Sequence, residues 1–126
     1  MWDDTNDECM PQLFNATGAP NWGDIANHPW TTGMQIDYFS EAGLWNEWLK
    51  QKHPEAKTVS ALAFNNDFGK SYVAGFEKAI EGTDLKVIDQ QFHEPTEPNL
   101  TNQFTTLAAS KADVVLIETS GTFCTQ

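Results

Sequence analysis

The chain has 126 residues, and a hydrophobic fraction of 40% is enough apolar material to fill the core of one ordinary domain. Eighteen acidic and seven basic residues give a formal net charge of −11, which argues against binding to nucleic acid or to anionic membrane surfaces. No run reaches the roughly 20 apolar residues that cross a bilayer, and residues 1–8 are acidic where a secretory signal would be basic and then apolar.

The first quarter of the chain predicts one short strand and a long connection. Residues 10–15 have the character of a short buried strand, and the small residues and closing proline of 16–20 predict a tight loop with exposed backbone amides. Residues 21–32 are aromatic and follow neither a helical nor a strand period. We interpret them as an irregular connection between two bodies.

A helix is expected next. It should begin between Ile36 and Ser40, with Asp37 or Ser40 as its N-cap, and end at His53, because the residue before Pro54 is driven out of the helical region. Apolar side chains at helical spacing predict its buried face. They are Tyr38, Ala42, Trp45 and Leu49.

From Thr58 to Gly121 the pattern of strand, loop and helix recurs. Residues 59–64 are almost continuously apolar, which is typical of a parallel strand covered on both faces. Residues 85–92 alternate and indicate a strand nearer the sheet edge, and the β-branched run 114–117 predicts a third strand. Strands spaced in this way are typical of right-handed βαβ units in a parallel sheet.

Two helices are expected between these strands. The first should run from about Lys70 to Glu81, with Gly82 as its stop signal, and the second should be capped by Asn99. Each has a predicted buried stripe. The stripes are Tyr72 or Val73, Phe76 and Ile80 in the first helix, and Leu100, Phe104 and Leu107 in the second.

Polar loops follow the carboxyl ends of all three strands. They are Asn65–Lys70, His93–Pro98 and Glu118–Gly121. In a parallel α/β sheet the carboxyl ends share one edge, where loop amides and helix N-termini converge on a ligand. The sequence therefore predicts a binding edge.

Signals for chemistry at this edge are weak. The histidines share no ligand spacing, so no metal site is expected, and the P-loop pattern fails because its first glycine would fall at Phe64. Asp67, Glu94 and Glu118 could gather at the edge as paired carboxylates, yet no nucleophile with a nearby base accompanies them. We expect no catalytic residues and no cofactor, and we interpret the acids as solvated loop residues.

The two cysteines decide nothing about the compartment. Cys9 and Cys124 lie near opposite ends of the chain without metal-type spacing. Free thiols, one disulfide and bridges to residues elsewhere all remain open at the level of sequence.

Three segments carry a family resemblance. Pro11–Pro20 holds an Ala-Thr loop before a proline, Asn66–Lys70 holds an aspartate, phenylalanine and glycine after a buried strand, and Ala112–Leu116 opens the last strand. Together they resemble the type I periplasmic binding proteins, and most of all the branched-chain amino acid (Leu/Ile/Val) substrate-binding proteins of ABC transporters. The resemblance implies an α/β fold with a doubly wound parallel sheet, as a fragment of a two-lobed protein. Residues 1–32 would hold the end of lobe 1 and the crossover, and residues 33–126 the first part of lobe 2 with three βα units.

The resemblance also implies a ligand site made by both lobes. The loop at residues 16–18 would offer backbone amides and a hydroxyl to the α-carboxylate of an amino acid, with each charge-assisted bond contributing roughly 1.5–3 kcal/mol. An aromatic side chain and the loop after the third strand would contact the ligand from lobe 2, and the acid that meets its ammonium group would come from a later strand. The expected ligand-binding residues are Ala16, Thr17, Gly18, Phe68, Thr119 and Ser120.

Other interpretations of these residues stay open. Without the resemblance, Phe68 is explained by packing between loop and helix, and Thr17 by stabilisation of its own turn. The aromatic linker with Trp22, His28 and Trp30 also departs from typical branched-chain members. Relatives of this architecture bind amides, urea or aromatic acids, so the ligand could be any small polar solute of these kinds.

The implied function is the substrate-binding component of an ABC transporter, which binds its solute by hinge closure. Its partners would be a small-molecule ligand, an amino acid or amide, and a membrane permease. The full-length protein would lie in the periplasm or outside the cell, including as a cell-envelope lipoprotein. The alternatives are a ligand-sensing domain of a signalling receptor with the same fold, and an α/β enzyme that uses the acids at the strand ends.

Overall fold

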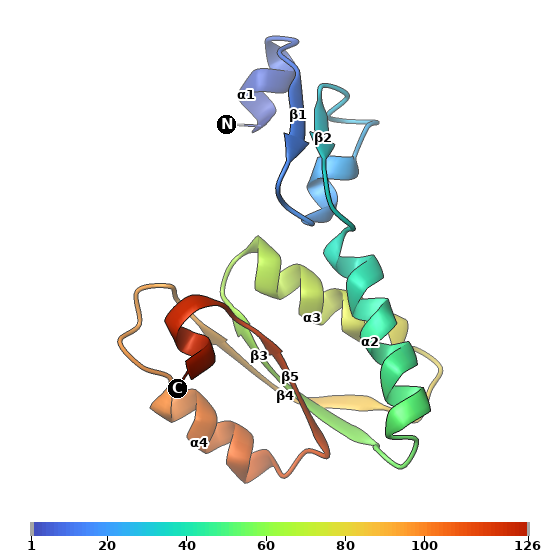
Figure 1. Ribbon diagram of the computed structural model, residues 1–126, viewed down its shortest axis with the longest axis vertical. Helices are drawn as coiled ribbons and strands as arrows, with labels where there is room; N and C mark the ends of the chain where they lie inside the picture. The colour runs from blue at the N-terminus through green and yellow to red at the C-terminus, as the bar shows by residue number, and fades with distance from the viewer. Residues whose placement is uncertain (1, 126) are drawn as a thin grey trace.

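The computed structural model describes residues 2–125, which form a small N-terminal body and a larger α/β body (Figure 1). The small body holds the helix α1 (Trp2–Asp7), the strands β1 (Gln12–Asn15) and β2 (Thr31–Gly33), and the 3₁₀ helix η1 (Pro20–Gly23). The strands β1 and β2 pair in parallel. A short connection leads from β2 into the larger body.

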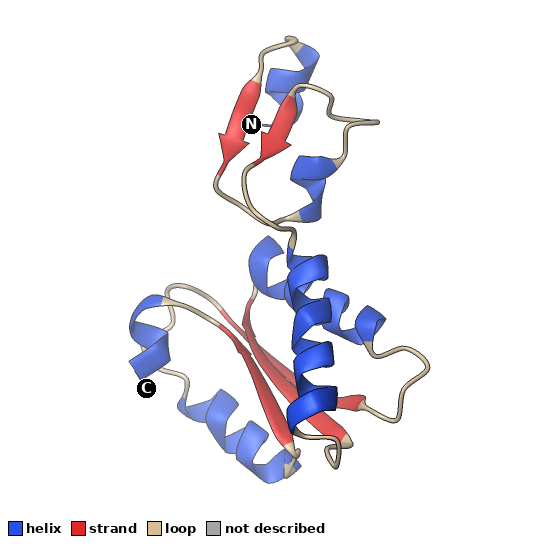
Figure 2. Ribbon diagram, turned by 45° about the vertical axis from the view of Figure 1, so that its right-hand side comes forward, coloured by secondary structure: helices blue, strands red, loops and turns tan. Residues whose placement is uncertain are grey.

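The larger body is a three-layer α/β unit (Figure 2). Its sheet has the order β4-β3-β5, and both pairings are parallel. The helices α2 and α3 pack against one face, where Val59 of β3 meets Phe76, and α4 packs against the other, where Leu62 meets Leu107. The elements in chain order are α2 (Tyr38–Lys52), β3 (Thr58–Phe64), α3 (Asp67–Ala79), β4 (Lys86–His93), α4 (Thr101–Ser110), β5 (Val114–Glu118) and the 3₁₀ helix η2 (Gly121–Thr125).

The strand predictions for the larger body are confirmed. The central strand β3 is buried from Val59 to Phe64, as its continuous apolar run predicts, and the alternating strand β4 lies at an edge. The other edge is β5, whose residues alternate between the covered and the open face. Val115 is 44% exposed and Ile117 51% exposed, so the apolar run does not bury both faces here.

Two predictions for the N-terminal body are wrong. Residues 31–32, assigned to an irregular connection over residues 21–32, begin the strand β2, and η1 overlaps the start of the same connection. The strand β1 forms, but it is not buried, because Leu13 is 60% exposed and Phe14 70% exposed. A two-stranded layer in which β2 alone flanks β1 leaves these side chains without cover.

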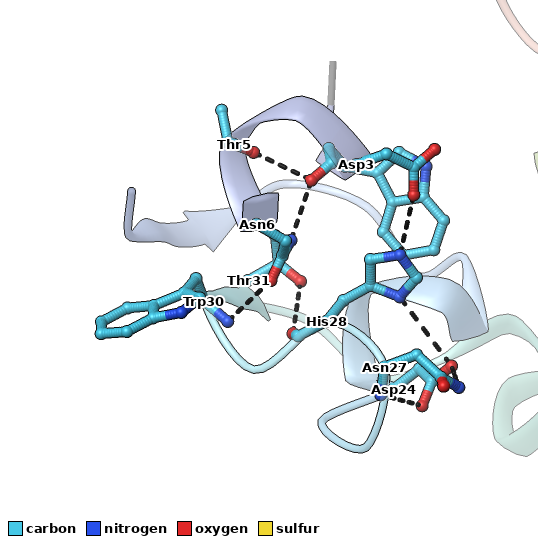
Figure 3. A network of polar contacts seen from close by, with 9 residues as sticks. Asp3, Thr5, Asn6, Asp24, Asn27, His28, Trp30 and Thr31 are labelled. Carbon is cyan, nitrogen blue, oxygen red and sulfur yellow. Dashed lines mark hydrogen bonds and ion pairs between the residues drawn. The ribbon is translucent and has the colours of Figure 1, made fainter. Parts of the chain in front are cut away.

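The aromatic connection is fixed against α1 by stacking and polar contacts (Figure 3). The ring of His28 stacks on Trp2 at 3.6 Å between centroids, and its Nε2 lies 2.8 Å from the carboxylate of Asp3. The backbone N–H of Trp30 donates to the side-chain oxygen of Asn6 at 2.9 Å. The departures from the family pattern in this segment therefore have a local structural role.

The helix predictions need small corrections. The helix α3 begins at Asp67 and not near Lys70, because the Asn66 side chain accepts a hydrogen bond from the backbone N–H of Gly69 at 3.2 Å and caps the helix earlier. It ends at Ala79. In α4 the N-cap position belongs to Leu100 instead of Asn99, although the Asn99 side chain still accepts a bond from the first helical N–H.

Two aromatic side chains assigned to buried stripes are exposed. Trp45 of α2 and Phe104 of α4 lie at the surface, whereas their neighbours in the same stripes, Ala42 and Leu107, are buried. Helical spacing identifies the inward sector of each helix, but the extent of cover depends on what packs beside it. Both exposed rings lie on the sides of the helices that the described part of the chain leaves open.

The cap on α3 gives a first prediction. Substituting Asn66→Ala should lower the free energy of unfolding by about 1 kcal/mol, because the Gly69 N–H loses its acceptor at the helix N-terminus. Asn66→Asp keeps an acceptor and should stay within a few tenths of a kcal/mol of the parent. Urea unfolding of the three proteins measures the difference, and equal midpoints for all three would contradict the capping role.

Candidate functional site

The three loops at the carboxyl ends of the strands share one edge, as predicted. The backbone N–H of Asn65 donates to the carbonyl of His93 at 2.8 Å, and the Asn65 side chain donates to the carboxylate of Glu94. The imidazole Nε2 of His93 lies 2.9 Å from the hydroxyl of Thr119. This edge of the sheet is turned toward the N-terminal body (Figure 1).

A hollow of about 540 Å³ opens beside the loop that precedes η1. Thr17 and Gly18, two of the predicted ligand-binding residues, form part of its wall, while Ala16 is exposed and lies outside the lining. The opposite wall comes from the connection between β2 and α2. The lining residues are Thr17, Gly18, Ala19, Pro20, Trp22, Gly23, Gly33, Gln35, Ile36 and Asp37.

The acid in this lining is already engaged. The carboxylate of Asp37 caps α2, accepting bonds from the backbone N–H of Ser40 at 3.0 Å and from its hydroxyl at 2.6 Å. The hydrogen bond from the Ser40 hydroxyl is the main reason that the pKa of Asp37 lies below its usual range, and the bond from the Ser40 backbone N–H adds to the effect. A fixed negative charge therefore borders the hollow at neutral pH.

Tyr38 joins the two bodies. Its backbone N–H donates to the carbonyl of Gly18 at 2.7 Å. A Cβ on Gly18 would lie 2.7 Å from the Tyr38 ring and 2.6 Å from the carbonyl oxygen of Ile36, so only glycine permits this approach. The sequence marked Tyr38 as a core residue of its helix and gave no sign of this joining role.

Phe68 packs against the ring of Tyr38. Its ring centroid is 5.1 Å from that of Tyr38 and 5.4 Å from that of Tyr72, both in edge-to-face geometry. Phe68 also packs against Phe64 in the core on the other face of the sheet. Its contacts are those of a packing residue, and it does not line the hollow.

The predicted residues after β5 are held in a different way. Thr119 is half-buried and bonded to His93, while Ser120 is exposed. Neither contributes to the lining of the hollow. The structure therefore brings Thr17 and Gly18 together at the hollow and places Phe68, Thr119 and Ser120 outside its lining.

A buried carboxyl group lies at the end of β5. Glu118 is 9% exposed, and burial raises its pKa to about 7, with a further contribution from the charge of Glu41. Burial, followed by a hydrogen bond to Glu41 and the charge of Glu118, raises the pKa of the Tyr72 hydroxyl. Sequence reasoning placed Glu118 among solvated loop acids, and this interpretation is wrong.

The described residues contain neither a metal-binding cluster nor a membrane-spanning helix. Within residues 2–125, no group of three or more His, Cys, Asp or Glu side chains could hold a metal ion. Cys9 and Cys124 are both exposed free thiols. No helix in this range has the length and apolar character needed to cross a membrane.

A family comparison decides what kind of chain this is. The family model described as periplasmic binding protein matches residues 9–126. The chain belongs to the periplasmic binding protein family. Membership in a family of binding proteins agrees with the prediction that the chain is not an enzyme. It also agrees with the predicted α/β fold with a parallel sheet.

Solved structures agree on the fold. One is a fatty acid ABC transporter substrate-binding protein from Thermomonospora curvata, with 22% identity and a TM-score of 0.76 over 90% of this chain. Another is an ABC transporter solute-binding protein from R. palustris in complex with benzoate, with 15% identity and a TM-score of 0.83 over 96% of this chain. A third is an amino acid ABC transporter substrate-binding protein from Pseudomonas fluorescens Pf-5, with 16% identity and a TM-score of 0.76 over 94%.

These similarities have a limited reach. At such low identity they establish the fold, an α/β unit with parallel strands, and leave the ligand undetermined. This chain spans 28%, 33% and 31% of the three solved chains, about a third of their length. No match was found among curated protein sequences.

Proposed function

We propose that this chain forms the middle part of a two-lobed solute receptor that supplies an ABC transporter. The receptor binds a small polar solute, an amino acid or an amide, between its lobes and presents it to a membrane permease. It works in the periplasm or elsewhere in the cell envelope. The observation that carries the proposal is the close joint between Gly18 and Tyr38, because it brings the Thr17 hollow onto the side of the larger body where the strand-end loops lie.

We assign the hinge of the receptor to the connection at residues 34–37, which adjoins this joint. Family membership and the fold support a two-body arrangement, and the bodies meet through the connection at residues 34–37. A solute that contacts loops of both bodies favours the closed arrangement by the difference in its binding free energy between the open and closed forms. The hollow of about 540 Å³ is large enough for an amino-acid-sized solute.

The charge of the chain supports a neutral or zwitterionic solute. A formal net charge of −11 and the fixed carboxylate of Asp37 at the hollow oppose the approach of a purely anionic ligand. The solved relatives named for a fatty acid, benzoate and an amino acid show that solutes differ widely among proteins of this fold. We favour an amino acid or amide because it combines a carboxylate or carbonyl for the Thr17 loop with N–H donors for lobe 2.

A thermal-shift panel on the receptor that contains this chain tests the proposal. Free amino acids and small amides should raise the melting temperature in a saturable way, because a ligand that binds only the folded state stabilises it. Isothermal titration should show binding with no chemical change in the recovered solute. Turnover of the solute, or no shift with any amino acid or amide, would sink the proposal.

The Thr17 hydroxyl gives a sharper form of this test. Thr17→Val keeps the side-chain shape but removes the hydroxyl, and we expect affinity for the solute to fall about tenfold, the effect of one lost hydrogen bond. Thr17→Ser keeps the hydroxyl, which also accepts from the backbone N–H of Ala19 at 3.2 Å, and should bind within about twofold of the parent. Equal affinities for all three proteins would remove Thr17 from the site.

A further inference from the structure

His93 is a buried imidazole that no role assigned so far uses. It is 1% exposed, and its ring packs against those of Phe64, at 4.4 Å between centroids, and Phe123, at 4.6 Å. Because the ring is buried, its nitrogens need hydrogen-bond partners within the protein. Both of its nitrogens therefore have fixed partners.

The two partners determine where the ring carries its proton. The Nδ1 atom lies 3.3 Å from the backbone carbonyl oxygen of Glu94, and the Nε2 atom lies 2.9 Å from the hydroxyl oxygen of Thr119. A carbonyl oxygen can only accept, so Nδ1 must carry the hydrogen. In the neutral ring Nε2 is then an acceptor, and the Thr119 hydroxyl must donate to it.

This arrangement uses the one hydrogen that Thr119 can donate. A threonine hydroxyl has a single O–H donor and two lone pairs. With the donor committed to His93, only the lone pairs remain available to any other partner. Thr119 is half-buried at the strand-end edge, in the loop that the family resemblance assigns to ligand contact.

We propose that His93 is a specificity-determining residue that turns the Thr119 hydroxyl into an obligate hydrogen-bond acceptor. The solute group that meets Thr119 is then a donor, such as an amide –NH₂ or an ammonium, and not a carboxylate. This inference rests on the proposed function, because it needs the Thr119 loop to contact the solute. His93 is a positioning residue here, since it acts through Thr119 and makes no contact with solute itself.

The discrimination between an amide and a carboxylate follows from the acceptor role of the Thr119 hydroxyl. A carboxylate oxygen opposite the Thr119 lone pairs would have no hydrogen to share, and the loss of one hydrogen bond corresponds to about tenfold in affinity. The carboxylate of Glu94, next to His93, opposes an anionic group in the same direction. An amide and its isosteric carboxylate should therefore be separated at this position.

The first test needs no solute. A long-range ¹H–¹⁵N correlation spectrum of the receptor near neutral pH reports the tautomer of each histidine ring. We expect the Nδ1–H tautomer for His93. An Nε2–H tautomer would make Thr119 the acceptor from His93, free its hydroxyl hydrogen and overturn the inference.

The second test measures selectivity with isosteric probes. The readout is the ratio of dissociation constants within the pair glutamine and glutamate, or benzamide and benzoate, whichever pair binds. The parent protein should favour the amide. His93→Asn removes the Nε2 acceptor, so the Thr119 hydroxyl can donate again, and the preference for the amide should fall about tenfold.

Two variants guard against a general loss of structure. Thr119→Val should weaken the amide about tenfold and leave the carboxylate within about twofold, even if His93→Asn folds poorly. His53→Asn changes an exposed histidine that is paired with Glu55 and should leave the ratio unchanged. If the ratio of amide to carboxylate affinity does not respond to His93→Asn or Thr119→Val, the inference is overturned. If no amino acid or amide in the panel binds, the proposed function is overturned instead. The tautomer measurement then decides the His93 assignment on its own.

Discussion

Gly69→Ala is expected to destabilise the protein by about 3 kcal/mol or more, because the first turn of α3 presses directly on the central strand. A Cβ at this position would lie 2.2 Å from the carbonyl oxygen of Phe64, 2.6 Å from its nitrogen and 3.0 Å from the Cβ of Ala63. The strand β3 is bonded to β4 on one side and to β5 on the other, so its backbone cannot move aside. The helix would have to shift instead.

The matched control is Gly43→Ala in α2. A Cβ on Gly43 meets no heavy atom within 4 Å, and alanine is the better helix former, so this variant should be neutral or more stable by up to about 1 kcal/mol. Urea unfolding, followed by far-UV circular dichroism, compares the two variants. Equal midpoints for Gly69→Ala and the parent would show that the first turn of α3 does not contact β3 as closely as the structure indicates.

The region around Gly69 illustrates which structural features can be predicted from the sequence. The motif from Asn66 to Gly69 was placed correctly after a buried strand, since a continuous apolar run bounded by polar turn residues is a strong local signal. The shared edge of the three loops also follows from topology alone, because parallel strands put their carboxyl ends together. These features depend on local pattern and chain direction, and both are legible in one sequence.

The failures involve contacts made at long range. The strand β2 has three residues, including a glycine, and only its pairing with β1 makes it a strand. The exposure of Trp45 and Phe104 likewise depends on what lies beside their helices and not on their spacing. Periodicity gives the direction in which a side chain points, but not whether anything meets it.

The candidate site divides in the same way. Thr17 and Gly18 were identified through resemblance, and the structure places them at a hollow. Tyr38 was missed as the joint because an aromatic residue in the first turn of a helix is usually a core residue, and its role arises only from the close approach of Gly18. Neither Gly18 nor Tyr38 lies in a local sequence pattern that predicts their contact.

Glu118→Gln is expected to stabilise the protein in a pH-dependent way. Burial first, and the charge of Glu41 second, raise the pKa of Glu118 from 4.5 to about 7 in the folded state. Below the unfolded value both states hold the proton, and the carboxyl group has no effect on stability. As the pH rises from 4.5 to 7, the unfolded chain releases the proton while the folded chain keeps it, so stability falls.

Above pH 7 the carboxylate is charged in both states and the full penalty is present. It amounts to about 3 kcal/mol, since each pKa unit corresponds to about 1.4 kcal/mol. Glutamine has no charge to bury, so the variant should exceed the parent by up to this amount at about pH 8 and match it at about pH 4. Glu47→Gln, on the exposed side of α2 where Glu47 pairs with Lys50, should stay within about 0.5 kcal/mol throughout.

The sign of this difference also reports on the surroundings of Glu118. The carboxyl group lies at the end of a groove of about 210 Å³ between α2 and β5, with Trp45 and Trp48 in its lining, and no hydrogen bond to it is found among the described residues. A cation placed there, from a solute or from another part of the receptor, would lower its pKa, and glutamine would then be the less stable residue above neutral pH. If the stability of Glu118→Gln relative to the parent rises with pH, the carboxylate is buried and unpaired. If it falls with pH, the carboxylate has a cationic partner. A relative stability that is independent of pH would contradict the burial of the group.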